Sequence, residues 1–376
     1  MTNTTHRPEC SATALYVGIE LGLREWFLTL STGPAAGRLR VRVRPGDRAA
    51  VVEAITRARA RFGLPPTAPV RSGYEAGRDG FWPHRFLATL GVDNLVVDSS
   101  SIEVPRRLRR AKTDRIDGEK LLQLLLRHWG GERKMWQVVH VPAPAAEDAR
   151  HASRSLTTLQ RERTRCRNRI HSLLALHGVR LRVDARLPAR LAAAQDWAGE
   201  PVLPGVQARV LETWRVWQAV ETERRARRTA EQQEVRTAPT PVLALAQRLT
   251  RLQGIAARSA TVLAEELFSR DLRNRRHVGA LCGLVSAPYR SGTLQHDQGL
   301  VGSGLPAVRR IAVEIAWAWV RFQPDSALTR WYQARFGGGG AVARRIGIVA
   351  LARRVIIALW RYATTGVLPE GALLKS

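Results

Sequence analysis

Short apolar runs at the spacing of β-strands, with a helical segment among them, constrain the fold of this chain most. Arg48–Phe62 has the pattern of a helix that ends at Gly63, and a tight turn at Gly22 would join the first two strands. Strands that alternate with helices indicate an α/β domain with a mixed sheet. Five segments have the length and residue types of strands: Leu15–Ile19, Trp26–Leu30, Leu39–Val43, Val70–Tyr74 and Leu95–Val97.

The composition changes near residue 145, where long helical patterns rich in arginine begin. Asp148–His177 and Val206–Arg236 are predicted to be long helices that pair either antiparallel within the chain or between molecules. Beyond a boundary at Ala238–Pro241 the chain is predicted to be mostly helical, with an irregular stretch between Gly283 and Gly304. We therefore expect three domains, at 1–144, 145–237 and 238–376.

The charge balance points to a polyanionic partner. Sixty Lys and Arg residues against 32 Asp and Glu residues give a formal net charge of +28, and almost all of the cations are arginine. The arginine fork suits phosphate oxygens and guanine edges. A GC-rich genome is an alternative source of arginine, but codon bias that exchanges Lys for Arg creates no net charge. Nucleic acid is therefore the expected partner.

Other sequence features narrow the class of protein. No stretch approaches the roughly 20 apolar residues needed to span a bilayer. The polar start of the chain does not resemble a signal peptide. Cys10, Cys166 and Cys282 lie far apart, which argues against a zinc site or a disulfide framework. We expect a cytoplasmic protein without a membrane partner.

Four carboxylates stand at places where they can meet. Asp114 and Asp117 are three residues apart, so a helix that starts here would place both on one face. Glu20 and Glu75 each follow a predicted buried strand. Like charges this close repel each other unless a cation lies between them. The alternative is structural: Asp114 and Asp117 would favour a helix start through the helix dipole, and the two glutamates would be solvated strand ends.

Such a set of carboxylates, from two strands and a helix, forms the metal site of RNase-H-like nucleases. There, two Mg²⁺ ions hold the attacking and leaving oxygens of a phosphodiester. Taken together, in this order and on these elements, the four residues favour a magnesium site over the structural alternative.

Six blocks of sequence resemble a known family, the insertion sequence 110 transposases, which are DEDD-type enzymes related to the Piv DNA invertase. The resemblance covers nearly the whole chain in the family's order. The blocks are VGIE (17–20), YEAG (74–77), KTDRIDGEKL (112–121), LQGIAARSATVLAEEL (252–267), LCGLVSAPYRSG (281–292) and VRRIAVEIAWAW (308–319).

The resemblance implies a fold, a site and partners. The fold would be an RNase-H-like (RuvC-like) domain, a helical coiled spacer and a mostly helical C-terminal transposase domain. The acidic tetrad would be Glu20, Glu75, Asp114 and Asp117, and the catalytic serine Ser291. The implied partners are Mg²⁺, double-stranded DNA from element ends and target, a structured guide RNA, and further copies of the chain in a homodimer or homotetramer.

Two departures from the family pattern bear on the site. Glu20 stands where the family usually has Asp, and the extra methylene shifts the oxygens of a magnesium ligand, which must meet near-ideal octahedral geometry. Gln298–Ala307 lacks a basic run that is common in the family. Ser286 is a weaker candidate for the nucleophile than Ser291, because it falls where the family tends to have proline.

Two further patterns leave alternatives open. Gln253–Ala256 before an Ala-rich helix is half of a phosphate-binding helix-hairpin-helix, or else a helix corner that needs glycine. Five tryptophans either stack on unpaired bases or, as their Leu and Val neighbours favour, belong to the core: Trp214, Trp217, Trp317, Trp319 and Trp331.

The leading hypothesis is a transposase that cuts and rejoins DNA, guided by RNA, through an acidic magnesium site and a serine nucleophile. The first alternative is a metal-dependent nuclease of the Holliday-junction resolvase type, in which Ser291 is structural. The second is a catalytically decayed protein that binds RNA or DNA, and Glu20 is the sequence feature that favours it.

Overall fold

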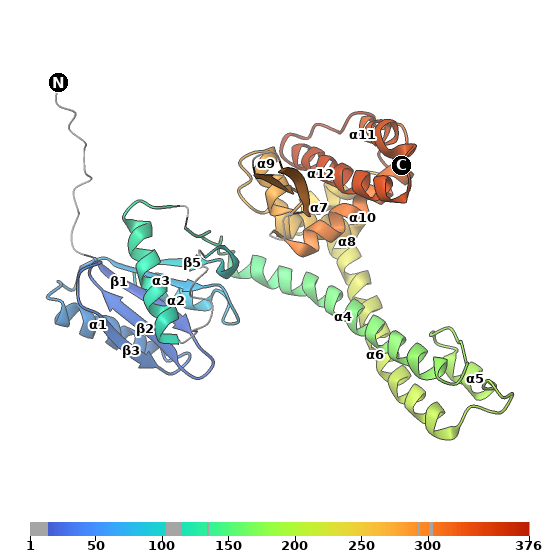
Figure 1. Cartoon of the computed structure of the whole chain (residues 1–376), viewed down its shortest axis with the longest axis horizontal. Coiled ribbons are helices and arrows are strands. Elements are labelled where there is room, and N and C mark those ends of the chain that lie inside the picture. Colours follow the sequence, from blue (N-terminus) through green and yellow to red (C-terminus); the bar gives the residue numbers. More distant parts are fainter. Residues whose placement is uncertain (1–13, 103–113, 134, 292–293, 301–303, 376) are drawn as a thin grey trace. The chain divides into compact units, whose positions relative to one another are not determined.

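The computed structural model describes residues 14–102, 114–133, 135–291, 294–300 and 304–375. Within these ranges the side chains of residues 100, 114–116 and 287–298 are not described. The chain forms two compact units, residues 1–142 and 143–376 (Figure 1).

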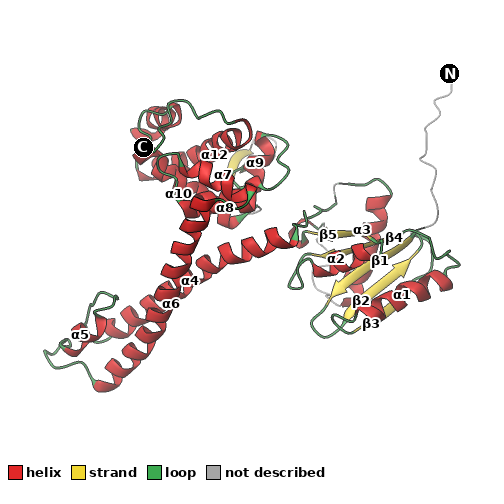
Figure 2. Cartoon of the chain, turned by 180° about the vertical axis from the view of Figure 1, so that it is seen from behind, coloured by secondary structure: helices red, strands yellow, loops and turns green. Residues whose placement is uncertain are grey.

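The described part of the first unit contains a five-stranded mixed sheet (Figure 2). Its strands are β1 (Leu15–Leu21), β2 (Trp26–Ser31), β3 (Leu39–Val43), β4 (Val70–Glu75) and β5 (Asp93–Val97). The order across the sheet is β3-β2-β1-β4-β5; β1 pairs antiparallel with β2 and parallel with β4. The mixed α/β class and the strands predicted from the apolar runs are confirmed.

Helices pack on both faces of this sheet. The N-terminus of α1 (Arg48–Arg61) is capped by Asp47, whose carboxylate accepts from the Ala50 N–H, and the helix ends before Gly63, which has a φ of +65°. The left-handed conformation at Gly63 is why the helix stops at the predicted place. The short helix α2 (Trp82–Thr89) and the 3-10 turn η1 (Ser99–Ser101) were not predicted. Helix α3 (Asp114–Trp129) packs against β1, β2 and β4.

The alternation of side chains along β1 separates two cores. Val17 and Ile19 point toward the core that also contains Val51 and Ile55 of α1. The intervening Gly18 faces α3, which has its own cluster around Leu121 and Leu125. Residues of β1 with even numbers therefore face α3, because side chains alternate between the faces of a sheet.

Two long helices begin the second unit. Helices α4 (Pro144–Ala175) and α6 (Pro204–Thr237) pack against each other within the chain, joined through the short helix α5 (Leu187–Ala192). Their shared core brings Leu174, near the end of α4, together with Val206, near the start of α6, so the helices are antiparallel. This is the first of the two predicted pairings. Helix α5 was not predicted, and Pro204 lies at the start of α6, where proline is well tolerated.

The rest of the second unit is mostly helical, as predicted. Trp319 lies at the centre of its core with no exposed surface, and the Trp319 Nε1–H donates to Ser326. The helices are α7 (Pro241–Thr250), α8 (Ala257–Val262), α9 (Arg275–Leu281), α10 (Pro306–Phe322), α11 (Ala327–Tyr332) and α12 (Ala341–Thr365), with π-helical segments η3 (Leu263–Phe268) and η4 (Gln333–Gly337).

One expectation for this region was wrong. The stretch between Gly283 and Gly304 is not irregular, because β6 (Ser286–Ser291) and β7 (Leu294–Leu300) pair as an antiparallel hairpin. Its strands contain Pro, Asp, Gln and Gly in place of an apolar alternation, so the sequence carries no strand signal there. The division of the second unit at residue 237 stays a prediction.

The tryptophans mostly serve the core. Trp217 and Trp319 are buried, and Trp214 and Trp331 pack partly against buried clusters. The side chain of Trp317 is half exposed. The core alternative therefore describes four of the five, and only Trp317 offers an open ring surface for stacking.

Candidate acidic site

Glu20 and Glu75 end neighbouring parallel strands. The last register pair between β1 and β4 joins Ile19 to Tyr74, and each of these residues is followed directly by one of the glutamates. Both glutamates are half-buried. The two carboxylates therefore leave adjacent strands at the same carboxyl edge of the sheet.

The same two glutamates share the face of the sheet that α3 covers. A Cβ atom on Gly18 would lie 2.9 Å from the Leu122 backbone nitrogen, and one on Gly73 would lie 3.3 Å from the Leu125 side chain. Glu20 and Glu75 each follow one of these glycines by two positions, so they point to the same side. The paired glycines allow α3 to approach the strands closely.

The start of α3 lies over the end of β1 and its partner strand. A Cβ atom on Gly118 would lie 3.0 Å from the Thr29 hydroxyl and 3.1 Å from the Phe27 ring. Phe27 is the register partner of Glu20. Asp117, which precedes Gly118 and is half-buried, therefore lies in the part of α3 that is nearest to Glu20.

Asp114 is the first residue of α3, one helical turn before Asp117. Its side chain lies outside the described residues. The helix on which the expected pairing of the two aspartates depended is present and begins at Asp114.

An ion pair holds this part of α3 against the edge of the sheet. Arg38, just before β3, donates to the Glu119 carboxylate at 3.0 Å, and Arg40 of β3 donates to its other oxygen at 3.1 Å. Sequence reasoning missed this role, although Leu39–Val43 alternates apolar residues with arginine, a pattern typical of a half-exposed strand. Glu119, the partner of both arginines, lies in the same sequence block, 112–121, as Asp114 and Asp117.

The chemistry of the four side chains suits a hard divalent cation, since all of the donors are carboxylate oxygens. Among the side chains that the structure describes, no group of three or more His, Cys, Asp or Glu is arranged to hold a metal ion. Asp114, the fourth carboxylate, is not among those side chains.

Ser291 belongs to the second unit. It is the last residue of β6, and its register partner is Leu294, the first residue of β7. The backbone of Ser291 thus lies where the hairpin reaches its turn; its side chain is outside the described set. A residue at a hairpin end is a common place for groups that contact a partner, because the strands hold the backbone while the tip stays accessible.

The Gln253–Ala256 segment forms a helix corner. Gly254 has a φ of +82°, and a Cβ atom there would lie 3.2 Å from the Ala318 carbonyl oxygen. The Gln253 N–H donates to the Leu373 carbonyl near the end of the chain. Because this donor is used within the protein and the helix that follows has only six residues, the described contacts favour the structural alternative over a phosphate site.

Comparison with known proteins decides the family. Residues 246–331 match the model of the transposase IS116/IS110/IS902 family. The chain is also 38% identical to "Putative transposase y4rJ" of Sinorhizobium fredii, over 96% of this chain and 95% of the relative. The chain belongs to the IS116/IS110/IS902 transposase family. The matched region of this transposase runs from α7 to α11 and includes the β6–β7 hairpin with Ser291.

The similarity to this relative includes the first unit, which carries Glu20 and Glu75, since the alignment covers 96% of this transposase. Within the described residues, the transposase has no helix that is long and apolar enough to span a bilayer.

Proposed function

We propose that this transposase cuts and rejoins DNA at the ends of an insertion sequence, with an acidic magnesium site and a serine nucleophile. The observation that carries the proposal is the placement of Glu20 and Glu75 on adjacent parallel strands, on the face covered by the helix that begins with Asp114 and Asp117. Carboxylates on two strands and a helix of a mixed sheet are the arrangement of an RNase-H-like (RuvC-like) domain.

Glu20, Glu75, Asp114 and Asp117 would hold the magnesium. When bound, two Mg²⁺ ions neutralise phosphate charge and favour ionisation of an attacking hydroxyl. The protein's part is to hold the carboxylates in place. The close contact of Gly18 and Gly118 and the ion pairs of Glu119 do this, because they set the height and position of α3 over the sheet.

Ser291 would supply the nucleophile. Its hydroxyl loses a proton and its oxygen bonds to phosphorus, while the bond from phosphorus to one strand oxygen breaks and that oxygen takes up a proton. A strand hydroxyl later displaces the serine and restores it. The position of Ser291 at the end of β6 supports this role, since the hairpin can present it to a backbone phosphate.

The acidic residues and Ser291 belong to different units of the chain. We propose that the active enzyme is a homodimer or homotetramer, in which the acidic site of one copy meets the serine of another. This assembly would make cutting depend on the pairing of two DNA ends.

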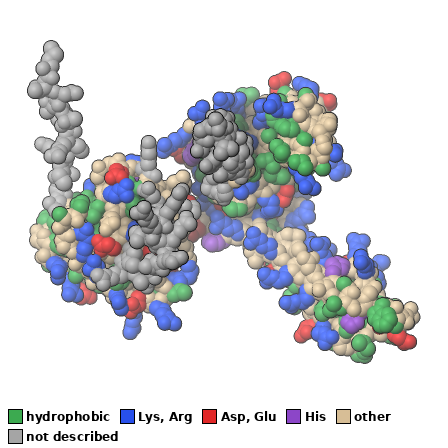
Figure 3. Space-filling view, viewed as in Figure 1, with side chains coloured by type: hydrophobic (Ala, Val, Ile, Leu, Met, Phe, Trp, Pro, Cys, Tyr) green, Lys and Arg blue, Asp and Glu red, His purple; other side chains and the backbone are tan. Residues whose placement is uncertain are grey.

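The partners would be double-stranded DNA and a structured guide RNA. The net charge of +28 supports polyanion binding, and Figure 3 shows basic side chains, all of them arginine, along the α4–α6 pair. Arg165, Arg182 and Arg225 are largely exposed on this pair and its connection. Exposed arginines on a protruding helical pair suit contacts to phosphates from several sides.

The decisive experiment tests for a protein–DNA bond. The full chain, purified from cells that carry its native locus so that bound RNA can be sequenced, is incubated with Mg²⁺ and DNA spanning the element ends. We expect a discrete RNA and a denaturation-resistant adduct that disappears in Ser291→Ala. Ser286→Ala, in the same strand, is the matched control and should keep the adduct.

Other outcomes would favour the two alternatives. Free DNA ends from Ser291→Ala, without an adduct in the native chain, would indicate a nuclease in which Ser291 is structural. Glu20 favours the remaining candidate, a binding protein whose catalysis has been lost. Salt-sensitive binding without cleavage, even in Glu20→Asp, would establish that candidate.

A further inference from the structure

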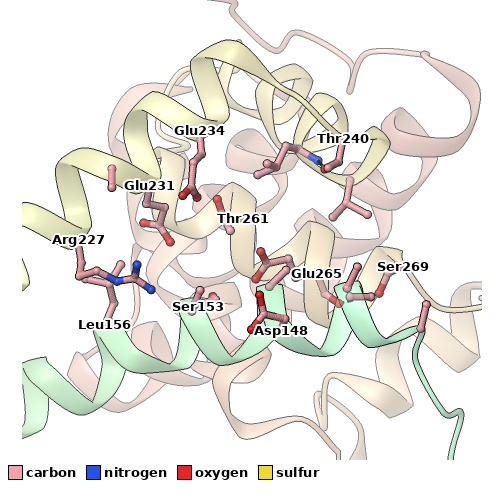
Figure 4. Close-up of a pocket in the computed structure, with 18 residues that line it drawn as sticks. Asp148, Ser153, Leu156, Arg227, Glu231, Glu234, Thr240, Thr261, Glu265 and Ser269 are labelled. Atoms are coloured by element: carbon pink, nitrogen blue, oxygen red, sulfur yellow. Dashed lines mark hydrogen bonds between the residues drawn. The ribbon is translucent and has the colours of Figure 1, made fainter. Parts of the chain in front are cut away.

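A cavity of about 460 Å³ lies within the second unit (Figure 4). Its lining includes neither Ser291 nor any residue of the first unit. Helices α4, α6 and α7, together with α8 and η3, supply its lining. Much of the wall is apolar, with alanines of α4, Leu156, Val242 and Leu243. This volume is in the range of sites for small organic molecules.

The charge of the cavity is opposite to that of the chain. Its described lining includes Asp148, Glu231, Glu234 and Glu265, against one arginine, Arg227. In a chain with a formal charge of +28, this is an acidic pocket in a basic protein. Figure 4 shows the carboxylates of Glu231 and Glu265 directed toward the same space.

Three buried oxygen atoms in the lining have no hydrogen-bond partner among the described residues: Glu231 Oε2, Glu265 Oε2 and Thr261 Oγ1. These side chains are only 6%, 8% and 3% exposed. A buried acceptor without a donor costs free energy, and two of these are carboxylate oxygens. The missing partner must therefore donate hydrogen bonds.

Arg258, the arginine that pairs with Glu231, already uses its donors on other atoms. Arg258 donates to Glu231 Oε1 at 2.9 Å, to the Ser153 hydroxyl at 2.7 Å and to the Thr157 hydroxyl at 2.9 Å. It holds Glu231 in place but does not reach the unpartnered oxygens. Glu266 is likewise turned away, since it pairs with Arg154.

Burial, followed by the charge of Glu231, raises the pKa of Glu265 to about 7, although a hydrogen bond from Ser153 opposes the shift. Burial also raises the pKa of Glu231. Both carboxyls are thus held where their charge is costly, and an incoming cation would relieve that cost.

We propose that this cavity binds an alkyl cation, that is, an ammonium or guanidinium group on an apolar stem. The cationic head donates to Glu231, Glu265 and Thr261, and the stem packs on the alanine-lined wall. A guanidinium carries five N–H donors and no acceptor, which matches a pocket of unpartnered acceptors. A bare metal ion fits less well, because the walls are apolar and no metal-holding group is found among the described residues.

The cationic group can come from two sources. One is a free amine or guanidine, and the other is an arginine or lysine side chain of a second copy of the chain. Agmatine is the guanidinium probe and spermidine the ammonium probe, each titrated into the full chain by calorimetry at constant ionic strength, with light scattering in parallel. Binding without a change in mass indicates a free ligand. Binding that lowers the mass of an oligomer indicates that the probe displaces a side chain of another copy.

Variants make the test specific. Glu265→Gln keeps the shape of the side chain and should weaken agmatine binding about tenfold or more, because a hydrogen bond to a charged group is lost. Ala149→Leu, which fills the cavity, should weaken it as well. Glu223→Gln, on the exposed side of α6, is the control and should bind as the native chain does. Circular dichroism checks that each variant is folded.

The dependence on pH gives a second readout. Besides Glu265, the charged groups that face the cavity or flank it are Asp148, Arg150, Arg227, Glu231, Glu234, Arg258 and Glu266. Since the cation binds the ionised carboxyl, affinity should rise as pH increases from 6 to 8, and Glu265→Gln should flatten this rise. Absence of binding by both probes at millimolar concentration, or equal binding by Glu265→Gln, would overturn the proposal.

Discussion

The guanidinium of Arg38 lies 3.0 Å from the Glu119 carboxylate, although 81 positions separate the two residues in the chain. The side chains are 16% and 25% exposed, so the pair is partly shielded from water. It connects the segment before β3 with the part of α3 that carries Asp117. The pair therefore helps to position Asp117 over the sheet, although neither Arg38 nor Glu119 belongs to the acidic tetrad.

Loss of this pair should affect both stability and the site. Arg38→Ala leaves Glu119 with only the more exposed Arg40, and we expect the free energy of unfolding to fall by about 1–2 kcal/mol. DNA cleavage should fall further than the unfolded fraction explains. Arg42→Ala is the control, because its pair with Glu25 is largely exposed and should contribute less than about 1 kcal/mol. Urea titration and a cleavage assay compare the two variants. Equal losses of stability and of cleavage in Arg38→Ala and Arg42→Ala would contradict the positioning role of Arg38.

Gly18→Ala should displace α3 from the sheet. The new Cβ would lie 2.9 Å from the Leu122 nitrogen and 3.0 Å from the Gly118 carbonyl oxygen, and backbone atoms cannot rotate away. We expect a loss of about 1–3 kcal/mol in thermal or urea unfolding. Gly33→Ala, where no atom lies within 4 Å of the new Cβ, should be neutral. A native-like stability for Gly18→Ala would show that α3 does not pack as closely as described.

Glu75→Gln tests the acidic site directly. If Glu75 is a magnesium ligand, the variant should lower Mg²⁺-dependent cleavage about 100-fold or more while the fold is kept. Titration with Mn²⁺, followed by water proton relaxation, should show weaker metal binding. Glu20→Asp should retain both properties. Unchanged cleavage in Glu75→Gln would remove Glu75 from the tetrad.

The α4–α6 pair should lose stability in acid through Glu221. Hydrogen bonding from Arg224, then Arg225, with the charge of Arg163, lowers the pKa of Glu221 to about 2. A carboxyl with a folded pKa below its ordinary 4.5 stabilises the fold above that value, and the contribution disappears as pH falls toward 2.

The variant Glu221→Gln should cost on the order of 3 kcal/mol at pH 7, since it leaves the arginines facing one another, and it should make unfolding less dependent on pH between 4.5 and 2. Glu223→Gln, exposed on the same helix, is the control. Denaturant titrations at pH 7 and pH 3 decide the matter; a pH dependence that is the same in both variants would rule out Glu221 as its source.

The sequence by itself determined the strands of the first unit, helix α1 and the two long helices of the second unit, but not the short helix α2. Leu39–Val43 is a strand in which apolar residues recur at the period of a sheet, and Leu15–Leu21 and Trp26–Ser31 are short apolar runs of the kind that forms buried strands. The ends of α1 at Asp47 and Gly63 also follow from local signals, since capping and glycine act within a few residues.

The tertiary structure alone decided what these elements bring together. That Glu20 and Glu75 leave adjacent strands depends on β1 pairing with β4, and pairing depends on contacts between distant segments. The ion pair of Arg38 with Glu119 and the acidic cavity around Glu231 and Glu265 have no sequence signature, because each joins side chains that are far apart in the chain. The β6–β7 hairpin was missed for a related reason: its polar strands are held by backbone pairing, which leaves no apolar pattern to read.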